Sequence, residues 1–316
     1  MKKRVYIIIL TLLLVGGAVL CAVRWQAWFG MPQEPEWTGD TIDSVLAYPD
    51  ARVLDQDTLT FLVLGDIHSQ LDWEDYDSLA ARVLPVDAVI QVGDWLDRGQ
   101  EYYRQQLLHE WTNSALNGTP VIACPGNHEY NKGLPKRLSE VWKQTFAHPE
   151  NGPGGVPGVS YSLNFENLLL VVIDTNPLDR LVYLTRTLTW LRNLMNQANA
   201  NDQFVVVVMH HPVLSAGKGR FNALIYSTFR HALGEADLVL AGHDHSYMRR
   251  APFVVLNTAG KPKQQRYYYT PDVTDIVPVY GVLKISYLPS PISHLQFSVY
   301  RLDDGTLIDS FDVKHD

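Results

Sequence analysis

Five clusters of metal-binding residue types occur along the chain, and each directly follows a short apolar run. The candidate ligands in these clusters are Asp66, His68, Asp94, Asn127, His210, His243 and His245. Imidazole, carboxylate and amide groups without cysteine suit Mn, Fe or Zn better than Cu(I) or an iron–sulfur cluster. A lone histidine at a strand end is usually a hydrogen-bonded rim residue. Five ordered clusters that take in six of the eleven histidines instead indicate a shared metal site.

The number of candidate ligands indicates more than one ion. Seven are too many for one tetrahedral ion, but they suit two ions that share a bridging carboxylate. Two such ions can hold a phosphate group, stabilise its charged transition state and generate hydroxide at neutral pH. His128 remains as a side chain that could donate a proton to the leaving oxygen. For His211, a substrate contact and structural support are equally open.

The apolar runs before the clusters are rich in Val, Ile and Leu, which is typical of short strands buried on both faces. Stretches with helical periodicity separate them, at residues 76–83, 102–116, 135–146, 187–197 and 221–233. Alternating strands and helices predict an α/β fold. Because ligands gather beyond the carboxyl ends of the strands in such sheets, five strand ends would present their polar residues to one crevice.

Glycine precedes the polar cluster in four of the five cases, at Gly65, Gly93, Gly126 and Gly242. A glycine at these points allows a sharp turn and a close approach to an ion. Asp174 also follows an apolar run but lacks the glycine, so we interpret it as a structural residue that caps the following turn.

The last part of the chain has a different pattern. Beyond Arg250 short segments alternate apolar and polar residues, and Asp304-Gly305 is a hairpin signal between the last two. We expect residues 251–316 to complete the second sheet of the domain.

The N-terminal segment has the pattern of a membrane anchor. Residues 5–23 form an uncharged apolar run that is long enough to cross a bilayer as a helix. Lys2, Lys3 and Arg4 precede it, so residues 1–4 would be cytoplasmic and the rest of the chain would lie outside, at the cell surface or in the periplasm. A cleaved signal peptide or a lipidated Cys21 are the alternatives. Residues 24–55 would form a linker with a short helix near Ser44–Leu46.

Charge and cysteine content narrow the function classes. The formal net charge is −8, and an acidic body argues against a broad nucleic-acid-binding surface. It leaves a small phosphorylated substrate open, because bound cations reverse the local field. The two cysteines, Cys21 and Cys124, indicate neither an internal disulfide nor a cysteine metal site.

The combined motifs resemble those of the calcineurin-like metallophosphoesterase superfamily over about residues 58–250. They read Asp66-x-His68, Gly93-Asp94, Gly126-Asn127-His128-Glu129, Val207-x-x-His210 and Gly242-His243-x-His245. The resemblance implies a four-layer α-β-β-α sandwich of two mixed sheets over residues 56–316, with a two-metal site of Mn, Fe or Zn at the strand ends. By motif, one ion would be held by Asp66, His68 and His245. The other would be held by Asn127, His210 and His243, with Asp94 between them and His128 as phosphate contact and general acid.

Two branches of the superfamily share features with this chain. The first half resembles phosphoserine/threonine phosphatases, in which the counterpart of Asp97 orients the acid histidine and that of Arg98 grips phosphate. For Arg98, a surface ion pair is the alternative. The second half, with its paired His243 and His245, is more similar to purple acid phosphatases. Those enzymes carry a tyrosine ligand where this chain has Asp97, so no iron–tyrosinate centre is expected.

The sequence therefore predicts hydrolysis of a phosphate ester by metal-activated hydroxide, with His128 as general acid. Arg98 and Asp97 favour a monoester, because an arginine can stabilise its extra charge. A phosphodiesterase and a non-catalytic scaffold of the same fold remain as alternatives. The expected partners are a small phosphorylated substrate, a phospholipid or a phosphoprotein, together with the membrane that holds the N-terminal helix.

Overall fold

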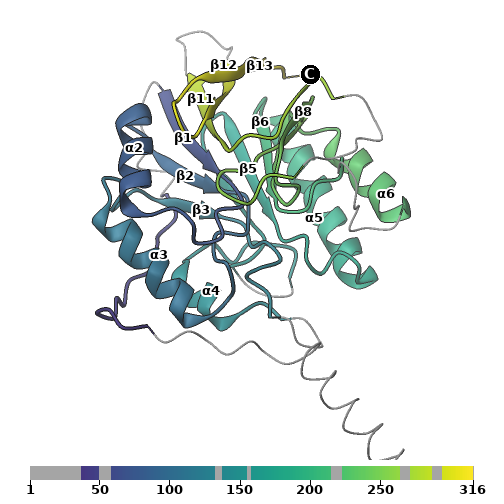
Figure 1. The fold of residues 1–316 in the computed structure, drawn as a ribbon. Helices are drawn as coiled ribbons and strands as arrows, with labels where there is room; N and C mark the ends of the chain where they lie inside the picture. Colours follow the sequence, from purple (N-terminus) through teal and green to yellow (C-terminus); the bar gives the residue numbers. More distant parts are fainter. Residues whose placement is uncertain are drawn as a thin grey trace, which may run out of the picture.

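Two β-sheets pack face to face, with helices on their outer sides (Figure 1). The computed structural model describes residues 37–49, 58–131, 137–154, 158–214, 223–263, 271–286 and 294–315, with the side chains of residues 223–227 left out. The expected α/β sandwich of two mixed sheets is confirmed. The expected anchor at residues 5–23 lies outside the described residues. Within the described ranges, no helix is long and apolar enough to cross a membrane.

The first sheet combines the start and the end of the domain. Its parallel strands are β1 (Thr58–Leu64), β2 (Ala88–Gln91) and β3 (Val121–Ala123). Its antiparallel strands are β11 (Val279–Ser286), β12 (His294–Arg301) and β13 (Leu307–Val313). The order across the sheet is β13-β12-β11-β1-β2-β3.

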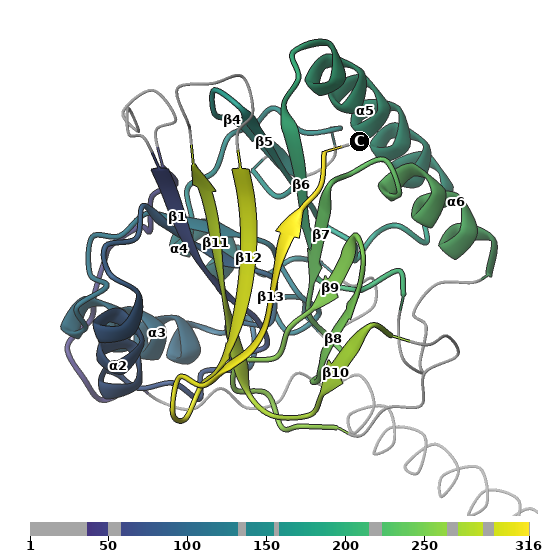
Figure 2. The same ribbon diagram turned by 90° about the horizontal axis from the view of Figure 1, so that it is seen from above.

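The second sheet contains the middle of the chain. Its strands are β4 (Tyr161–Asn164), β5 (Leu168–Ile173), β6 (Phe204–Met209), β7 (Leu238–Ala241), β8 (Tyr247–Arg250), β9 (Phe253–Val255) and β10 (Val273–Asp275). The order is β10-β8-β9-β7-β6-β5-β4, with β5, β6, β7 and β9 parallel. Tyr247 and Arg249 of β8 donate to Asp309 of β13 at 2.7 and 2.6 Å, which ties the two sheets together along one side (Figure 2).

The expectation that residues 251–316 complete the second sheet was wrong for the last three strands. Only β9 and β10 join that sheet, whereas β11 pairs with β1 from Thr58↔Ser286 to Val63↔Gly281 and brings β12 and β13 into the first sheet. Alternation of side chains reveals which face of a strand is buried, but not which sheet edge the strand will cover. Here the edge of β1 takes the returning chain.

The helices cover both outer faces. On the first sheet lie α2 (Trp73–Val83), α3 (Glu101–Asn113) and α4 (Glu140–Thr145), and on the second lie α5 (Leu181–Ala200) and α6 (Ala223–Leu233) (Figure 1). The α4 helix begins later than predicted because Ser139 caps it, accepting from the N–H of Val141. The α5 helix is longer than predicted, and its buried face extends to Leu184 and Ala198, which lie outside the predicted range.

The short helix expected near Ser44–Leu46 was wrong, because this segment is extended. Leu46 donates to the carbonyl of Thr145 and accepts from the N–H of Ala147 at 2.8 and 3.2 Å. The carbonyl of Ala47 accepts from the N–H of Val121 at 2.7 Å. Partners from α4 and β3 therefore satisfy the backbone groups that a local helix would have used.

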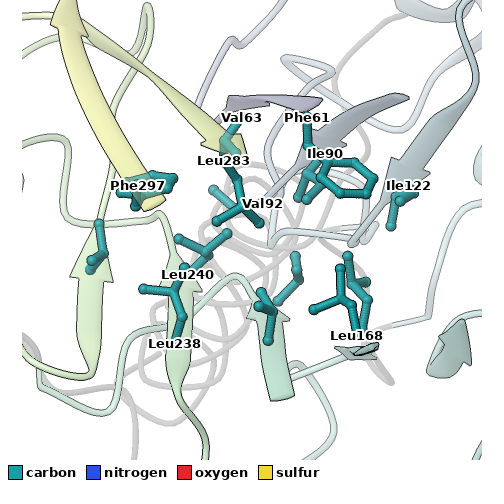
Figure 3. Close-up of a cluster of buried hydrophobic side chains, with 14 of the residues drawn as sticks. Phe61, Val63, Ile90, Val92, Ile122, Leu168, Leu238, Leu240, Leu283 and Phe297 are labelled. Carbon is teal, nitrogen blue, oxygen red and sulfur yellow. The ribbon is translucent and has the colours of Figure 1, made fainter. Parts of the chain in front are cut away.

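The core lies between the sheets. Phe61, Ile90 and Ile122 of the first sheet face Leu168 and Leu240 of the second in one buried cluster (Figure 3). Two further apolar clusters lie beneath the helices, one on the outer face of each sheet. The parallel strands are thus buried on both faces, as their continuous apolar runs predict.

A glycine in β11 allows a close contact in this core and provides a test of the strand packing. A Cβ at Gly281 would lie 2.5 Å from the ring of Phe297 and 3.2 Å from Val63. Gly281→Ala should therefore destabilise the protein by about 1–3 kcal/mol through overpacking. In a Phe297→Ala background, itself less stable by about 3–5 kcal/mol, the same change should cost clearly less. Denaturant unfolding of the four proteins measures this coupling, and equal costs in both backgrounds would contradict the β11–β12 packing.

Candidate metal centre

Strained turns at the strand ends carry the candidate ligands. Five of these residues have left-handed backbone conformations: Asp66 (φ 50°), His68 (52°), Asp94 (56°), His243 (71°) and His245 (53°). Such conformations cost about 1–3 kcal/mol each for residues other than glycine and cluster at functional sites. Bonds between neighbouring turns hold them, because the N–H of His68 donates to the carbonyl of Asp94 at 2.9 Å and that of Asp66 to Gly93 at 3.1 Å.

The glycines before the clusters leave room for the candidate ligands themselves. A Cβ at Gly242 would lie 2.5 Å from Oδ2 of Asp66, and a Cβ at Gly126 would fall on the carboxylate of Asp94. Gly93 has a φ of 102°, and a Cβ there would overlap the ring of His210. The close approach predicted from the sequence is therefore an approach between turns that bear ligands.

One group of candidate ligands joins the two sheets through Asp66, His68 and His245. Nε2 of His68 lies 3.2 Å from Nε2 of His245, which in turn lies 3.6 Å from Oδ1 of Asp66. One ligand atom of each lies within 4.8 Å of the others, and all three residues are buried. This spacing allows the three atoms to coordinate one ion.

A second group lies beside it. Nε2 of His210 is 3.3 Å from Oδ1 of Asn127 and 3.3 Å from Nδ1 of His243. Asp94 lies between the groups, with Oδ2 3.3 Å from Nε2 of His210 and 3.9 Å from Nε2 of His68. The structure thus brings all seven predicted ligands together, with a carboxylate where two ions could share it.

Hydrogen bonds fix which imidazole nitrogen faces the crevice. Nδ1 of His210 lies 3.1 Å from the carbonyl of Val92, and Nδ1 of His245 lies 2.9 Å from the carbonyl of Lys261. A carbonyl only accepts, so Nδ1 carries a hydrogen and Nε2 faces the carboxylates, where it offers a lone pair when the ring is neutral. Lone pairs and carboxylate oxygens at these distances need a proton or a cation between them, which is the chemistry of a metal site.

Backbone N–H groups hold the carboxylates of Glu129 and Asp66 in place. The side chain of Glu129 accepts from Asp94, Leu96 and Gly126 at 3.1, 2.9 and 2.7 Å. Asp66 accepts twice from the N–H of His243, at 3.0 and 2.8 Å. Glu129 was not among the predicted site residues. Its place directly after Asn127-His128 was nevertheless a signal that it supports the neighbouring loops.

The pKa shifts of Asp66, Asp94 and His210 reflect burial and the negative charge that the carboxylates bring to the cluster. Burial raises the pKa of Asp66 well above its usual value. Burial alone would also raise the pKa of Asp94, but the charge and hydrogen bond of His210 hold it below its usual range. Burial opposes the charged form of His210, yet Asp94 raises its pKa to about 9. His210 therefore holds a proton beside Asp94, whereas burial lowers the pKa of His68 to about 4. A cation would compete with the proton on His210.

His128, Asp97 and Arg98 lie at the edge of this cluster. The rings of His128 and His68 have centroids 4.4 Å apart. Nδ1 of His128 bonds to the backbone carbonyl of Asp97 at 2.5 Å, whereas the carboxylate of Asp97 is 3.9 Å away and lies 3.6 Å from Nε of Arg98. The direct partner of the imidazole is therefore the carbonyl of Asp97, and the carboxylate expected in that position faces the arginine as well.

Two residues outside the predicted ligand set have structural partners. Nδ1 of the buried His211 is 2.7 Å from Oγ1 of Thr175, and His211 also lies within ligand distance of His210 and His243. Oδ1 of Asp174 accepts from the N–H of Asn176 at 2.9 Å, which is the turn cap predicted for it.

Comparison with known proteins identifies relatives of this fold. The sequence model of the calcineurin-like phosphoesterases matches residues 59–247. Among solved structures, a purple acid phosphatase, PPD1 from yellow lupin (Lupinus luteus) seeds, aligns with a TM-score of 0.61 and 14% identity over 81% of this chain and 53% of its own. This chain spans about half the length of the lupin protein. GAP50, the anchor in the inner membrane complex of Plasmodium, aligns with a TM-score of 0.54 and 14% identity over 81% of this chain and 89% of its own. No curated protein sequence matches the chain.

The space left by Gly242 provides a test of the cluster. In Gly242→Ala, the new Cβ should displace the carboxylate of Asp66 and lower the affinity for Mn²⁺ by about 10–100-fold, the usual effect of disturbing a ligand's surroundings. Isothermal titration of the metal-free protein measures the change. Gly234→Ala is the control, because its Cβ would meet only carbonyl oxygens at 3.4 Å. Unchanged affinity in Gly242→Ala would contradict a ligand role for Asp66.

Proposed function

The chain belongs to the calcineurin-like phosphoesterase family, and we propose that it hydrolyses phosphate monoesters with two metal ions bound between its sheets. The observation that carries this proposal is the position of Asp94. Its carboxylate lies within 4 Å of a nitrogen in each of two ligand groups, as a bridging ligand requires.

The two groups would hold one ion each. Asp66, His68 and His245 would bind the first, and Asn127, His210 and His243 the second, with Asp94 shared. The donors are oxygen and imidazole nitrogen, which fit Mn, Fe or Zn. When bound, such ions supply positive charge for a phosphate group and make hydroxide available at neutral pH for attack on phosphorus.

The protein's own contribution to bond cleavage would come from His128. With Nδ1 bonded to the carbonyl of Asp97, its protonated ring would keep the Nε2 hydrogen for the leaving oxygen. Its backbone N–H donates to Oδ1 of Asp94 at 2.8 Å, which fixes the acid next to the proposed bridging ligand. The proton would pass from Nε2 to the ester oxygen as the bond to phosphorus breaks.

Arg98 supports a monoester as the substrate. Its side chain is about one-third exposed and lies in the same loop as the carbonyl that orients His128. A guanidinium binds two phosphate oxygens in parallel, and a monoester offers one more charged oxygen than a diester. The substrate could be a small phosphorylated molecule, a phospholipid or a phosphoprotein.

We propose a location for the reaction on the basis of the N-terminal segment. The uncharged run at residues 5–23, preceded by Lys2, Lys3 and Arg4, supports a single membrane anchor. The catalytic domain would then lie outside the cytoplasm, at the cell surface or in the periplasm.

Removing the proposed acid should affect substrates unequally. In His128→Ala, we expect both ions to remain and turnover of phenyl phosphate to fall by about 10²–10⁴-fold. Turnover of p-nitrophenyl phosphate should fall much less, because its leaving oxygen needs little protonation. His109→Ala, an exposed histidine on α3, is the control. An equal loss on both substrates would contradict a general-acid role.

Substrate preference tests the function itself. The full-length protein in detergent, stripped of metal and refilled with Mn²⁺ or Zn²⁺, should hydrolyse p-nitrophenyl phosphate faster than bis-p-nitrophenyl phosphate. Faster turnover of the diester would instead indicate a phosphodiesterase. Bound metal without turnover of either would favour a scaffold, the alternative to which the similarity with the Plasmodium anchor points.

A further inference from the structure

The turn after β5 contacts site residues that follow strands of both sheets. Asp174 and Asn176 bond to the loop of residues 125–130, which follows β3, and Thr175 bonds to His211, which follows β6. We propose that Asp174 and Asn176 are positioning residues that hold Asn127 against His210 and so set the affinity of the second metal site. This inference rests on the proposed two-metal function.

Asn176 grips the start of the loop. Its Nδ2 donates to the carbonyl of Gly126 at 3.1 Å and lies 3.4 Å from that of Pro125. The Gly126 carbonyl belongs to the peptide bond that continues into Asn127, and this bond is planar. Because Glu129 binds the N–H of Gly126 at 2.7 Å, the residue directly before Asn127 is held on both sides.

Asp174 grips the end of the same loop. Its Oδ2 accepts from the hydroxyl of Tyr130. Its Oδ1 accepts from the backbone and side-chain nitrogens of Asn176, at 2.9 and 3.0 Å. Asp174 therefore orients the amide that holds Gly126 while it fixes Tyr130. Asn127 and His128 lie between these two attachment points.

The ligands of the second metal site come from opposite sheets, so their positions depend on hydrogen bonds that cross between the sheets. Asn127 follows β3 and His210 follows β6, yet their ligand atoms are 3.3 Å apart. Apolar packing between the sheets is non-directional and sets their spacing without fixing an atom to a fraction of an ångström. Hydrogen bonds across the interface supply that direction. Thr175 adds the matching contact on the other side, 2.7 Å from Nδ1 of His211.

The first group is anchored differently. His245 is oriented by the carbonyl of Lys261, and Asp66 by the N–H of His243. Loss of the Asn176 amide should therefore weaken one metal-binding step and spare the other. A general loss of stability would weaken both steps together, so this selectivity distinguishes positioning from a merely structural role.

Calorimetric titration of the metal-free, full-length protein with Mn²⁺ tests the inference. The wild type should show two binding steps. In Asn176→Ala, the affinity of one step should stay within about 2–3-fold of the wild type, and that of the other should fall by at least about 10-fold. This is the lower end of the effect seen when residues that support metal ligands are mutated. Asn127→Ala identifies the step that belongs to the second group. Asn151→Ala is the matched control, because Asn151 makes two 2.9 Å bonds to the backbone of Ser162 on the outer strand β4.

Tyr130→Phe provides the second variant. It removes one hydroxyl at the end of the loop and leaves Asn176 in place, so we expect a smaller loss in the same step. If near-ultraviolet circular dichroism shows that Asn176→Ala is not folded, Tyr130→Phe decides the question. Both steps unchanged, or both weakened equally, would overturn the inference while leaving the proposed function intact. A wild-type protein that binds fewer than two ions would overturn the two-metal function and this inference together.

Discussion

The face-to-face packing of the two sheets is the constraint on which the candidate metal centre depends. Asp66, Asp94 and Asn127 follow strands of one sheet, whereas His210 and His245 follow strands of the other. Each half alone offers an incomplete set of donors. The buried cluster of large aliphatic and aromatic side chains that joins the sheets therefore also sets the spacing at which the ligands of the two sheets face each other. A change in the thickness of this core would alter the ligand geometry from a distance.

Holding the ligands of the two sheets in one cluster costs free energy. The cluster combines buried carboxylates, lone pairs at short distance and five residues in left-handed conformations. Hydrogen bonds from the backbone offset part of this free energy. The carboxylate of Glu129 accepts from three N–H groups, and both oxygens of Asp66 accept from the N–H of His243. The remaining imbalance is electrostatic, and it is why the pKa of His210 rises to about 9. A cation that entered such a site would stabilise it, so metal binding and folding stability would be linked.

The clustering of the candidate ligands was predictable from the sequence because its signal is local. An apolar run, a glycine and a ligand lie next to one another in the chain, and parallel strands align their carboxyl ends at one edge. The pairing of β11 with β1 was not predictable, since it joins residues more than two hundred positions apart and alternation names no partner. The extended segment around Leu46 depends in the same way on groups supplied by Thr145 and Val121. For His128, the motif predicted a contact with the carboxylate of Asp97, whereas the hydrogen bond in the structure is to the backbone carbonyl of that residue.

Under the proposed function, the contact between Asp97 and Arg98 would let the site respond to its substrate. The two side chains are about one-third exposed and 3.6 Å apart, and an ion pair of this kind contributes about 0–1 kcal/mol. A phosphate dianion close to the crevice offers the guanidinium a doubly charged, bidentate partner. Arg98 would then exchange a weak contact for a stronger one, and the carboxylate of Asp97 would become free to turn towards His128. Such an exchange would couple recognition of the third charged oxygen to the orientation of the proposed acid, which a diester could not trigger to the same extent.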